Sequence, residues 1–266
     1  MRTRIFTAMG LAAVLVGVLL FGSAWAARAL FGLFIAAGAW EWSAFLGAPT
    51  QVRRMAYMLL VVALASAARL WLDERREFSG LMQIGVYWWT LALMWLLIAP
   101  QRTAPWAAAV AGVFALVPTW VALSRIIELW PLGAHWVLFI LSLSFAADTG
   151  AYFVGQAYGR VKLAPRVSPH KTWEGVLGGM ALAAVVGFAG SRWFGLAASV
   201  FVPLCLLGAA FSVVGDLTES MFKRAAGLKD SGRLFPGHGG VLDRVDGVLA
   251  ATPVMCVGLL WLGVGT

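Results

Sequence analysis

Long apolar runs decide what this chain can fold into. Each run approaches the ~20 apolar residues that a helix needs to cross the hydrocarbon core of a bilayer. Only 12% of the 266 residues are charged and 61% are hydrophobic, whereas a soluble domain is roughly a quarter charged. The sequence therefore predicts an all-α polytopic membrane protein, with nine candidate spans at about residues 5–24, 28–46, 54–72, 83–99, 105–124, 135–155, 174–191, 197–219 and 246–264.

The positions of Lys and Arg predict the orientation of these spans. With the N-terminus in the cytoplasm, 14 of the 20 Lys and Arg fall on the cytoplasmic side. The first segment has the pattern of a secretory signal, but we expect a retained span because another apolar run follows it. The net charge of +8 fits basic loops beside anionic lipid, so we expect no nucleic-acid partner. Cys205 and Cys256 lie in apolar runs without metal-ligand spacing and are expected to be packing residues.

The chain divides into two parts by the distribution of its polar residues. Residues 1–130 carry few polar groups away from span ends, and we interpret them as a transmembrane scaffold of about five helices with a surface for dimer contact. Residues 131–266 contain two polar loops, 156–173 and 223–245. Two spans separate these loops, so both fall on the cytoplasmic side and can build one catalytic site there.

The first of these polar regions suggests a binding site for anions. Asp148 lies inside a predicted span, where a carboxylate costs a few kcal/mol and more often marks a site than a simple helix pair. In "GRVKLAPRVSPHKTWEG", residues 159–175, prolines hold the loop off helix, and "SPHKTWEG" has the pattern of a helix N-terminus. Backbone N–H groups at such an end bind anions, and Lys171 would add positive charge. An ordinary basic cytoplasmic loop is the alternative interpretation.

The second polar region suggests a metal site. Asp216 and Glu219 are three residues apart, as are Asp243 and Asp246, and this spacing places side chains on one face of a helix. Like charges that close repel unless a cation lies between them, and oxygen ligands point to Mg²⁺. His238 is either a phosphate contact or a brace for the turn "PGHGG", whose glycines allow the backbone to approach a phosphate. Acids for a metal beside bases for phosphates are typical of phosphoryl or nucleotidyl transfer.

These residues match a known family. The run "SMFKRAAGLKDSGRLFPGHGGVLDRVD", residues 220–246, resembles the signature of phosphatidate cytidylyltransferases (CDP-diacylglycerol synthases), and residues 148–175 are also similar to that family. The resemblance implies that CTP and phosphatidic acid give CDP-diacylglycerol and pyrophosphate. It also implies Mg²⁺, with room for a second cation such as K⁺, a homodimer, and a bacterial inner membrane location.

The resemblance further implies roles for individual residues. The implied metal ligands are Asp216, Asp243 and Asp246. The candidate catalytic residues are Lys171, Lys223, Arg224, Lys229, Asp230, His238 and Arg244. The candidate substrate-binding residues are Asp148, Ser168, Thr172, Glu174, Ser220, Gly239 and Gly240.

Three other functions compete with this interpretation. A CTP-dependent polyprenol kinase would use similar equipment but would release CDP instead of pyrophosphate. A transporter predicts interrupted helices in two symmetric halves, and the sequence shows no such symmetry. A purely structural membrane protein would have no use for acids and bases clustered in one loop.

Overall fold

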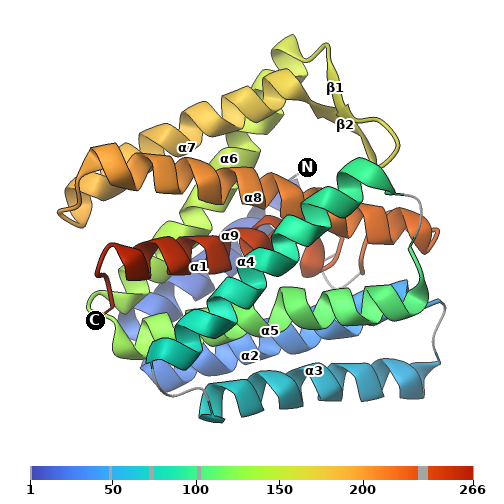
Figure 1. Ribbon diagram of the computed structural model, residues 1–266, viewed down its shortest axis with the longest axis horizontal. Coiled ribbons are helices and arrows are strands. Elements are labelled where there is room, and N and C mark those ends of the chain that lie inside the picture. The colour runs from blue at the N-terminus through green and yellow to red at the C-terminus, as the bar shows by residue number, and fades with distance from the viewer. Residues whose placement is uncertain (1, 48–49, 72–74, 101–102, 233–238, 266) are drawn as a thin grey trace.

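The computed structural model describes residues 2–47, 50–71, 75–100, 103–232 and 239–265. Within these ranges the protein is a bundle of long helices with one small β-hairpin (Figure 1). The helices of the N-terminal part are α1 (Arg2–Phe21), α2 (Ala24–Trp42), the 3₁₀ turn η1 (Ser43–Phe45), α3 (Gln51–Trp71), α4 (Arg75–Ile98) and α5 (Pro105–Leu129). The C-terminal part contains α6 (Gly133–Tyr158), β1 (Lys162–Ala164), β2 (Ser168–Thr172), α7 (Trp173–Trp193), α8 (Ala198–Ala225) and α9 (Leu242–Trp261).

Seven helices of the described part are long and apolar enough to cross a membrane. They are α3 to α9, and they correspond to seven of the nine spans expected from the sequence. Helices α1 and α2 do not meet the same criteria of length and hydropathy among the described residues; α2 carries a charged residue near each end, Arg28 and Glu41. The chain is thus a multi-pass helical protein, whereas the count of nine and the orientation stay predictions.

The second polar loop is shorter than the sequence indicates. Helix α8 continues to Ala225 and helix α9 begins at Leu242, so helical structure extends into the expected loop 223–245 from both sides. Lys223 therefore lies on the last turn of α8, and Asp243 lies on the first turn of α9. The prediction failed at these ends because charged residues within a helix end look like loop residues when only hydropathy is considered.

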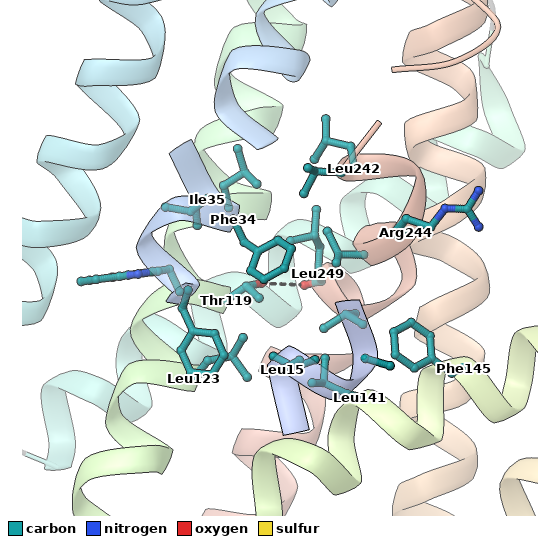
Figure 2. Close-up of a pocket in the computed structure, with 17 residues that line it drawn as sticks. Leu15, Phe34, Ile35, Thr119, Leu123, Leu141, Phe145, Leu242, Arg244 and Leu249 are labelled. Atoms are coloured by element: carbon teal, nitrogen blue, oxygen red, sulfur yellow. Dashed lines mark hydrogen bonds between the residues drawn. The ribbon is translucent and has the colours of Figure 1, made fainter. Parts of the chain in front are cut away.

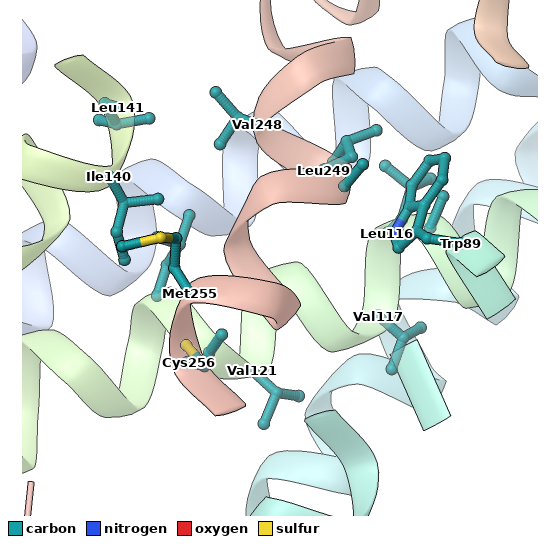
Figure 3. Close-up of a cluster of buried hydrophobic side chains, with 14 of the residues drawn as sticks. Trp89, Leu116, Val117, Val121, Ile140, Leu141, Val248, Leu249, Met255 and Cys256 are labelled. Atoms are coloured by element: carbon teal, nitrogen blue, oxygen red, sulfur yellow. The ribbon is translucent and has the colours of Figure 1, made fainter. Parts of the chain in front are cut away.

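Helix α9 is the centre of the bundle. It packs against α8 and α6, and also against α2, α4 and α5 of the N-terminal part. Figure 3 shows Val248, Leu249 and Met255 of α9 among buried side chains of α4, α5 and α6. Cys205 and Cys256 are both buried with free thiols, which agrees with their expected packing role. The first turn of α9, which carries the predicted metal ligands, is therefore fixed by helices from both parts of the chain.

The first polar loop folds into an antiparallel hairpin that was not expected in an all-α protein. Strands β1 and β2 pair with Lys162 opposite Thr172 and Ala164 opposite Ser168. Ala164 and Ser168 each precede a proline, and that position is biased toward extended backbone. Helices α6 and α7 lie side by side below the hairpin (Figure 1). They approach so closely that a Cβ on Gly150 would lie 2.5 Å from the backbone oxygen of Gly178.

Candidate active site

A network around Lys223 joins the ends of α8 and α9. The ammonium of Lys223 lies 2.5 Å from Oδ1 of Asp243 and 3.3 Å from Oε2 of Glu219. All three side chains are largely buried. Two carboxylates beside one buried ammonium compensate its charge, so Lys223 holds the two helix ends together by electrostatic attraction.

The other carboxylate oxygen of Asp243 organises the loop between the two helices. Oδ2 accepts hydrogen bonds from the backbone N–H of Ser231 at 3.0 Å and of Gly240 at 2.8 Å. The hydroxyl of Ser231 also lies 2.9 Å from this oxygen. Both oxygens of Asp243 thus accept hydrogen bonds from donors of the chain itself. These bonds tie Ser231, in the glycine-rich loop that follows α8, to Gly240 just before α9.

Glu41 of α2 completes this network from the N-terminal part of the chain. It is 4% exposed, and its Oε2 accepts the backbone N–H of Leu242 at 2.9 Å and lies 3.1 Å from the Ser231 hydroxyl. A Cβ on Gly232 or Gly240 would lie 2.2 and 2.3 Å from the Glu41 carboxylate oxygens. Only glycine lets the loop pass this close, so the glycines of the loop make room for a carboxylate of the protein.

A separate polar cavity lies where the hairpin meets α6, α7 and α8. Its volume is about 640 Å³, which falls within the ~300–1,000 Å³ typical of small-molecule sites. Lys171 of β2 forms an ion pair with Asp216 of α8 inside it. The remaining charged or polar side chains of its wall are Asp148, Tyr152, Gln156, Lys162, His170 and Thr172.

The hairpin is anchored to α7 by the cap that the sequence predicted. The Thr172 hydroxyl accepts the backbone N–H of Gly175 at 3.2 Å, as an N-cap does. The carboxylate oxygens of Glu174 accept the backbone N–H of Val161 at 3.1 and 3.2 Å. The predicted helix N-terminus is therefore real, and the role of Glu174 seen here is to fasten the hairpin to the helix.

Four acids, Asp148, Asp216, Glu219 and Asp246, form an acidic cluster beside this cavity. The carboxylate of Asp246 interacts electrostatically with the other three and with Lys171. Like charges this close repel one another unless cations compensate them, and Lys171 and Lys223 supply part of that compensation. The oxygen chemistry of Asp216 and Asp246 fits a hard divalent cation such as Mg²⁺.

The metal ligands predicted from the sequence are not equivalent in the structure. Among the described residues, no three His, Cys, Asp or Glu side chains are placed closely enough to share a metal ion. Asp216 is paired with Lys171, whereas both oxygens of Asp243 accept from Lys223, Ser231 and Gly240. A metal at Asp243 would have to compete with these donors, so this ligand set stays a prediction.

The other predicted residues lie in different surroundings. Ser220, whose hydroxyl lies 3.4 Å from Oδ1 of Asp216, belongs to the interior of the site, while Ser168 lies half-buried in the hairpin. Lys229 and Asp230 are exposed, as is Arg224, which donates to the Leu228 carbonyl at 3.3 Å. His238 lies outside the described residues, Gly239 adopts a positive φ of 79° beside Asp243, and Arg244 lies at the edge of a second cavity.

Sequence reasoning missed Glu41, Ser231 and Tyr152. Glu41 was detectable, because a carboxylate inside the apolar run "GAWEW" carries the same signal that singled out Asp148. Ser231 and Tyr152 carry no such signal, since a serine in a polar loop and a tyrosine near a span end are common.

Comparison with known proteins identifies the family of the chain. A family model described as the cytidylyltransferase family matches residues 2–261. The chain belongs to the cytidylyltransferase family. A phosphatidate cytidylyltransferase of Pseudomonas aeruginosa is 41% identical to it over 98% of this chain and 97% of its own length. One of Haemophilus influenzae is 37% identical over 95% and 96%, and one of Brucella suis is 48% identical over 47% of each chain.

Membership of the cytidylyltransferase family shows that the chain is an enzyme. The family name denotes a nucleotidyltransferase, and such an enzyme must hold a triphosphate. The wall of the polar cavity combines the cations of Lys171 and Lys162 with the carboxylates of Asp148 and Asp216. Basic side chains for phosphates and oxygen ligands for a metal are the groups that nucleotidyl transfer requires.

Proposed function

We propose that this chain is a phosphatidate cytidylyltransferase, which forms CDP-diacylglycerol and pyrophosphate from CTP and phosphatidic acid. The relatives that match it over nearly the whole chain carry that name. The observation that carries the proposal is the polar cavity with its Lys171–Asp216 ion pair, built from helices long enough to span a membrane. A cavity of this kind lets a water-soluble triphosphate meet a lipid phosphate at the membrane surface.

The reaction makes modest demands on the protein. A phosphate oxygen of phosphatidic acid attacks the α-phosphorus of CTP, and the bond from that phosphorus to the bridging oxygen of the β-phosphate breaks. The second pKa of a phosphomonoester is ~6, so this nucleophile is already deprotonated at neutral pH. No general base is needed, and the protein contributes mainly by positioning and charge neutralisation.

The residues of the cavity supply these contributions. Lys171 faces both the cavity and Asp216, so it can bind a phosphate of CTP when that ion pair opens. Lys162 and His170 lie in the same wall and would orient the triphosphate. Asp216 and Asp246 would hold Mg²⁺, which when bound neutralises phosphate charge, and the remaining acids allow a second cation such as K⁺.

The Lys223 network has a supporting part in this proposal. Its ammonium is buried between Asp243 and Glu219, so it positions the glycine-rich loop and the α9 acids instead of reaching into the cavity. The exposed cations Arg224 and Lys229 would attract CTP from the cytoplasm. A homodimer in the bacterial inner membrane, with the cavity facing the cytoplasm, completes the proposal.

The decisive experiment is an assay of the purified protein with CTP and phosphatidic acid, with and without Mg²⁺. We expect CDP-diacylglycerol and pyrophosphate in equal amounts, only with the divalent ion. Release of CDP together with a phosphorylated lipid would identify a kinase instead. Uptake of a solute into sealed vesicles without CTP consumption would favour a transporter.

A further inference from the structure

A second cavity lies in the apolar interior next to α9. Its volume is about 340 Å³, and its wall is formed by α1, α2, α5, α6 and α9. Figure 2 shows Leu123, Leu141 and Leu249 around it, with Arg244 at the edge and its guanidinium directed away from the apolar side chains. Arg244 is the one charged side chain among the described residues of this wall.

One face of α6 connects this apolar cavity to the polar cavity. Leu141 and Phe145 line the apolar cavity, whereas Asp148 and Tyr152 line the polar cavity. The spacing of these four residues, at steps of four and three, places them in one stripe along the helix. The stripe is about 16 Å long at 1.5 Å per residue, and it changes from apolar to charged between Phe145 and Asp148.

The direction of the stripe suits a lipid. The polar end lies toward the hairpin that follows α6, and the apolar end lies toward the middle of the helix. A molecule lying along it would have a polar head beside Lys171 and a hydrocarbon chain between α5, α6 and α9.

We propose that the apolar cavity binds one acyl chain of the phosphatidic acid substrate, positioned so that its phosphate reaches the polar cavity. The cations of Lys162 and Lys171 at the polar end of the stripe favour an anionic lipid over a neutral one. That the lipid is phosphatidic acid rests on the function proposed above. Since the bilayer is as apolar as the cavity, the cavity acts by positioning the chain and limiting its length, not by extracting the lipid from the membrane.

The wall of the apolar cavity is firm enough to discriminate between acyl chains of different length. Thr119 of α5 donates a hydrogen bond to the backbone oxygen of Leu249 at 3.0 Å, across the wall (Figure 2). Leu123, Leu141 and Leu249 are nearly fully buried. A larger side chain here cannot be absorbed by movement into water, so it should shorten the space left for an acyl chain.

The first test measures acyl-chain dependence in a variant with a smaller cavity. Leu123→Trp fills the cavity from α5, and Val110→Trp places the same ring on the exposed face of the same helix. Overpacking of this kind corresponds to roughly a five- to hundredfold effect. We expect Leu123→Trp to lower kcat/KM about tenfold for dipalmitoyl phosphatidate and less than about twofold for dihexanoyl phosphatidate. Equal losses for both substrates, or equal effects of the two variants, would overturn the proposal.

The second test uses the unmodified protein and does not depend on catalysis. In vesicles, phosphatidate with a photoreactive diazirine near the end of one acyl chain should label α6 and α9 peptides containing Leu141 and Leu249. Phosphatidylcholine with the same chain should label only outward side chains such as Leu59 of α3, which is 56% exposed. Equal labelling of the cavity by both lipids would contradict the proposal. If the enzyme releases no pyrophosphate but phosphatidate labels the cavity, the proposed function fails while the lipid site stands.

Discussion

Glu41 on α2 accepts a hydrogen bond from the backbone N–H of Leu242 on α9, 201 residues further along the chain. Through this contact the N-terminal part of the protein contributes a side chain to the site. The scaffold predicted for residues 1–130 therefore does more than fill the membrane, because its buried carboxylate holds the first turn of α9. The acids of that turn, Asp243 and Asp246, depend on this support for their positions.

Replacing Glu41 should loosen the site. In Glu41→Ala, the buried N–H of Leu242 loses its acceptor, which costs about 1–3 kcal/mol. We expect a lower thermal unfolding temperature in detergent and a reduced kcat with little change in the KM for CTP. Glu41→Gln keeps one carbonyl oxygen as an acceptor and should retain most of both properties. Glu77→Ala, at an exposed acid of α4, is the control and should change neither.

Removing Lys223 should destabilise the junction between α8 and α9. Lys223→Met leaves Asp243 and Glu219 buried without a cation, and breaking a buried ion pair costs about 3–5 kcal/mol. The double variant Lys223→Met with Glu219→Gln removes one of the two charges and should recover part of this loss. A double-mutant cycle on thermal stability measures the coupling, and strictly additive effects would argue against the network.

Lys171 should matter for chemistry more than for stability. In Lys171→Ala the phosphates lose a cation and Asp216 loses its partner, so we expect turnover to fall by about 10²–10³, as for loss of one charge-stabilising group. Arg166→Ala removes an exposed cation of the same hairpin, outside the cavity wall, and should keep near-normal turnover. Similar losses in the two variants would show that only the overall charge of the hairpin counts.

The close packing of α6 on α7 should tolerate no side chain at Gly150. In Gly150→Ala the new methyl group would lie 2.5 Å from the backbone oxygen of Gly178, so the helices must separate. Overpacking costs about 1–3 kcal/mol, and we expect a lower unfolding temperature together with weaker CTP binding, because α6 and α7 carry the cavity wall. Gly80→Ala on α4 has open space around the new methyl group and should be neutral or slightly stabilising. An unchanged unfolding temperature for Gly150→Ala would contradict the observed helix spacing.

The divalent ion should act through the acidic cluster. Asp216→Asn removes one carboxylate from the cluster, and we expect a higher Mg²⁺ concentration for half-maximal activity. Glu77→Gln, at an exposed acid of α4, should leave the Mg²⁺ dependence unchanged. The check is a Mg²⁺ titration of turnover at saturating CTP for each variant.

The sequence by itself determined the helical membrane class of the molecule and its enzyme family. Apolar runs of span length have few alternatives to membrane helices, because an unpaired backbone is too costly in hydrocarbon. The N-cap at Thr172 and the signature at residues 220–246 could also be recognised in the sequence, since both are local patterns. Hydropathy did not place the ends of α8 and α9, where buried charged residues continue the helices.

Only the tertiary structure decided which charges meet. Asp243 looked like Asp216 and Asp246 in the sequence, yet it is engaged by Lys223, Ser231 and Gly240, while Asp216 pairs with Lys171 across the hairpin. The same holds for Glu41, which reaches the loop through contacts between helices distant in the chain. The physical reason is that a carboxylate's partner is set by the packing of whole helices, and local spacing in the sequence carries no record of that packing.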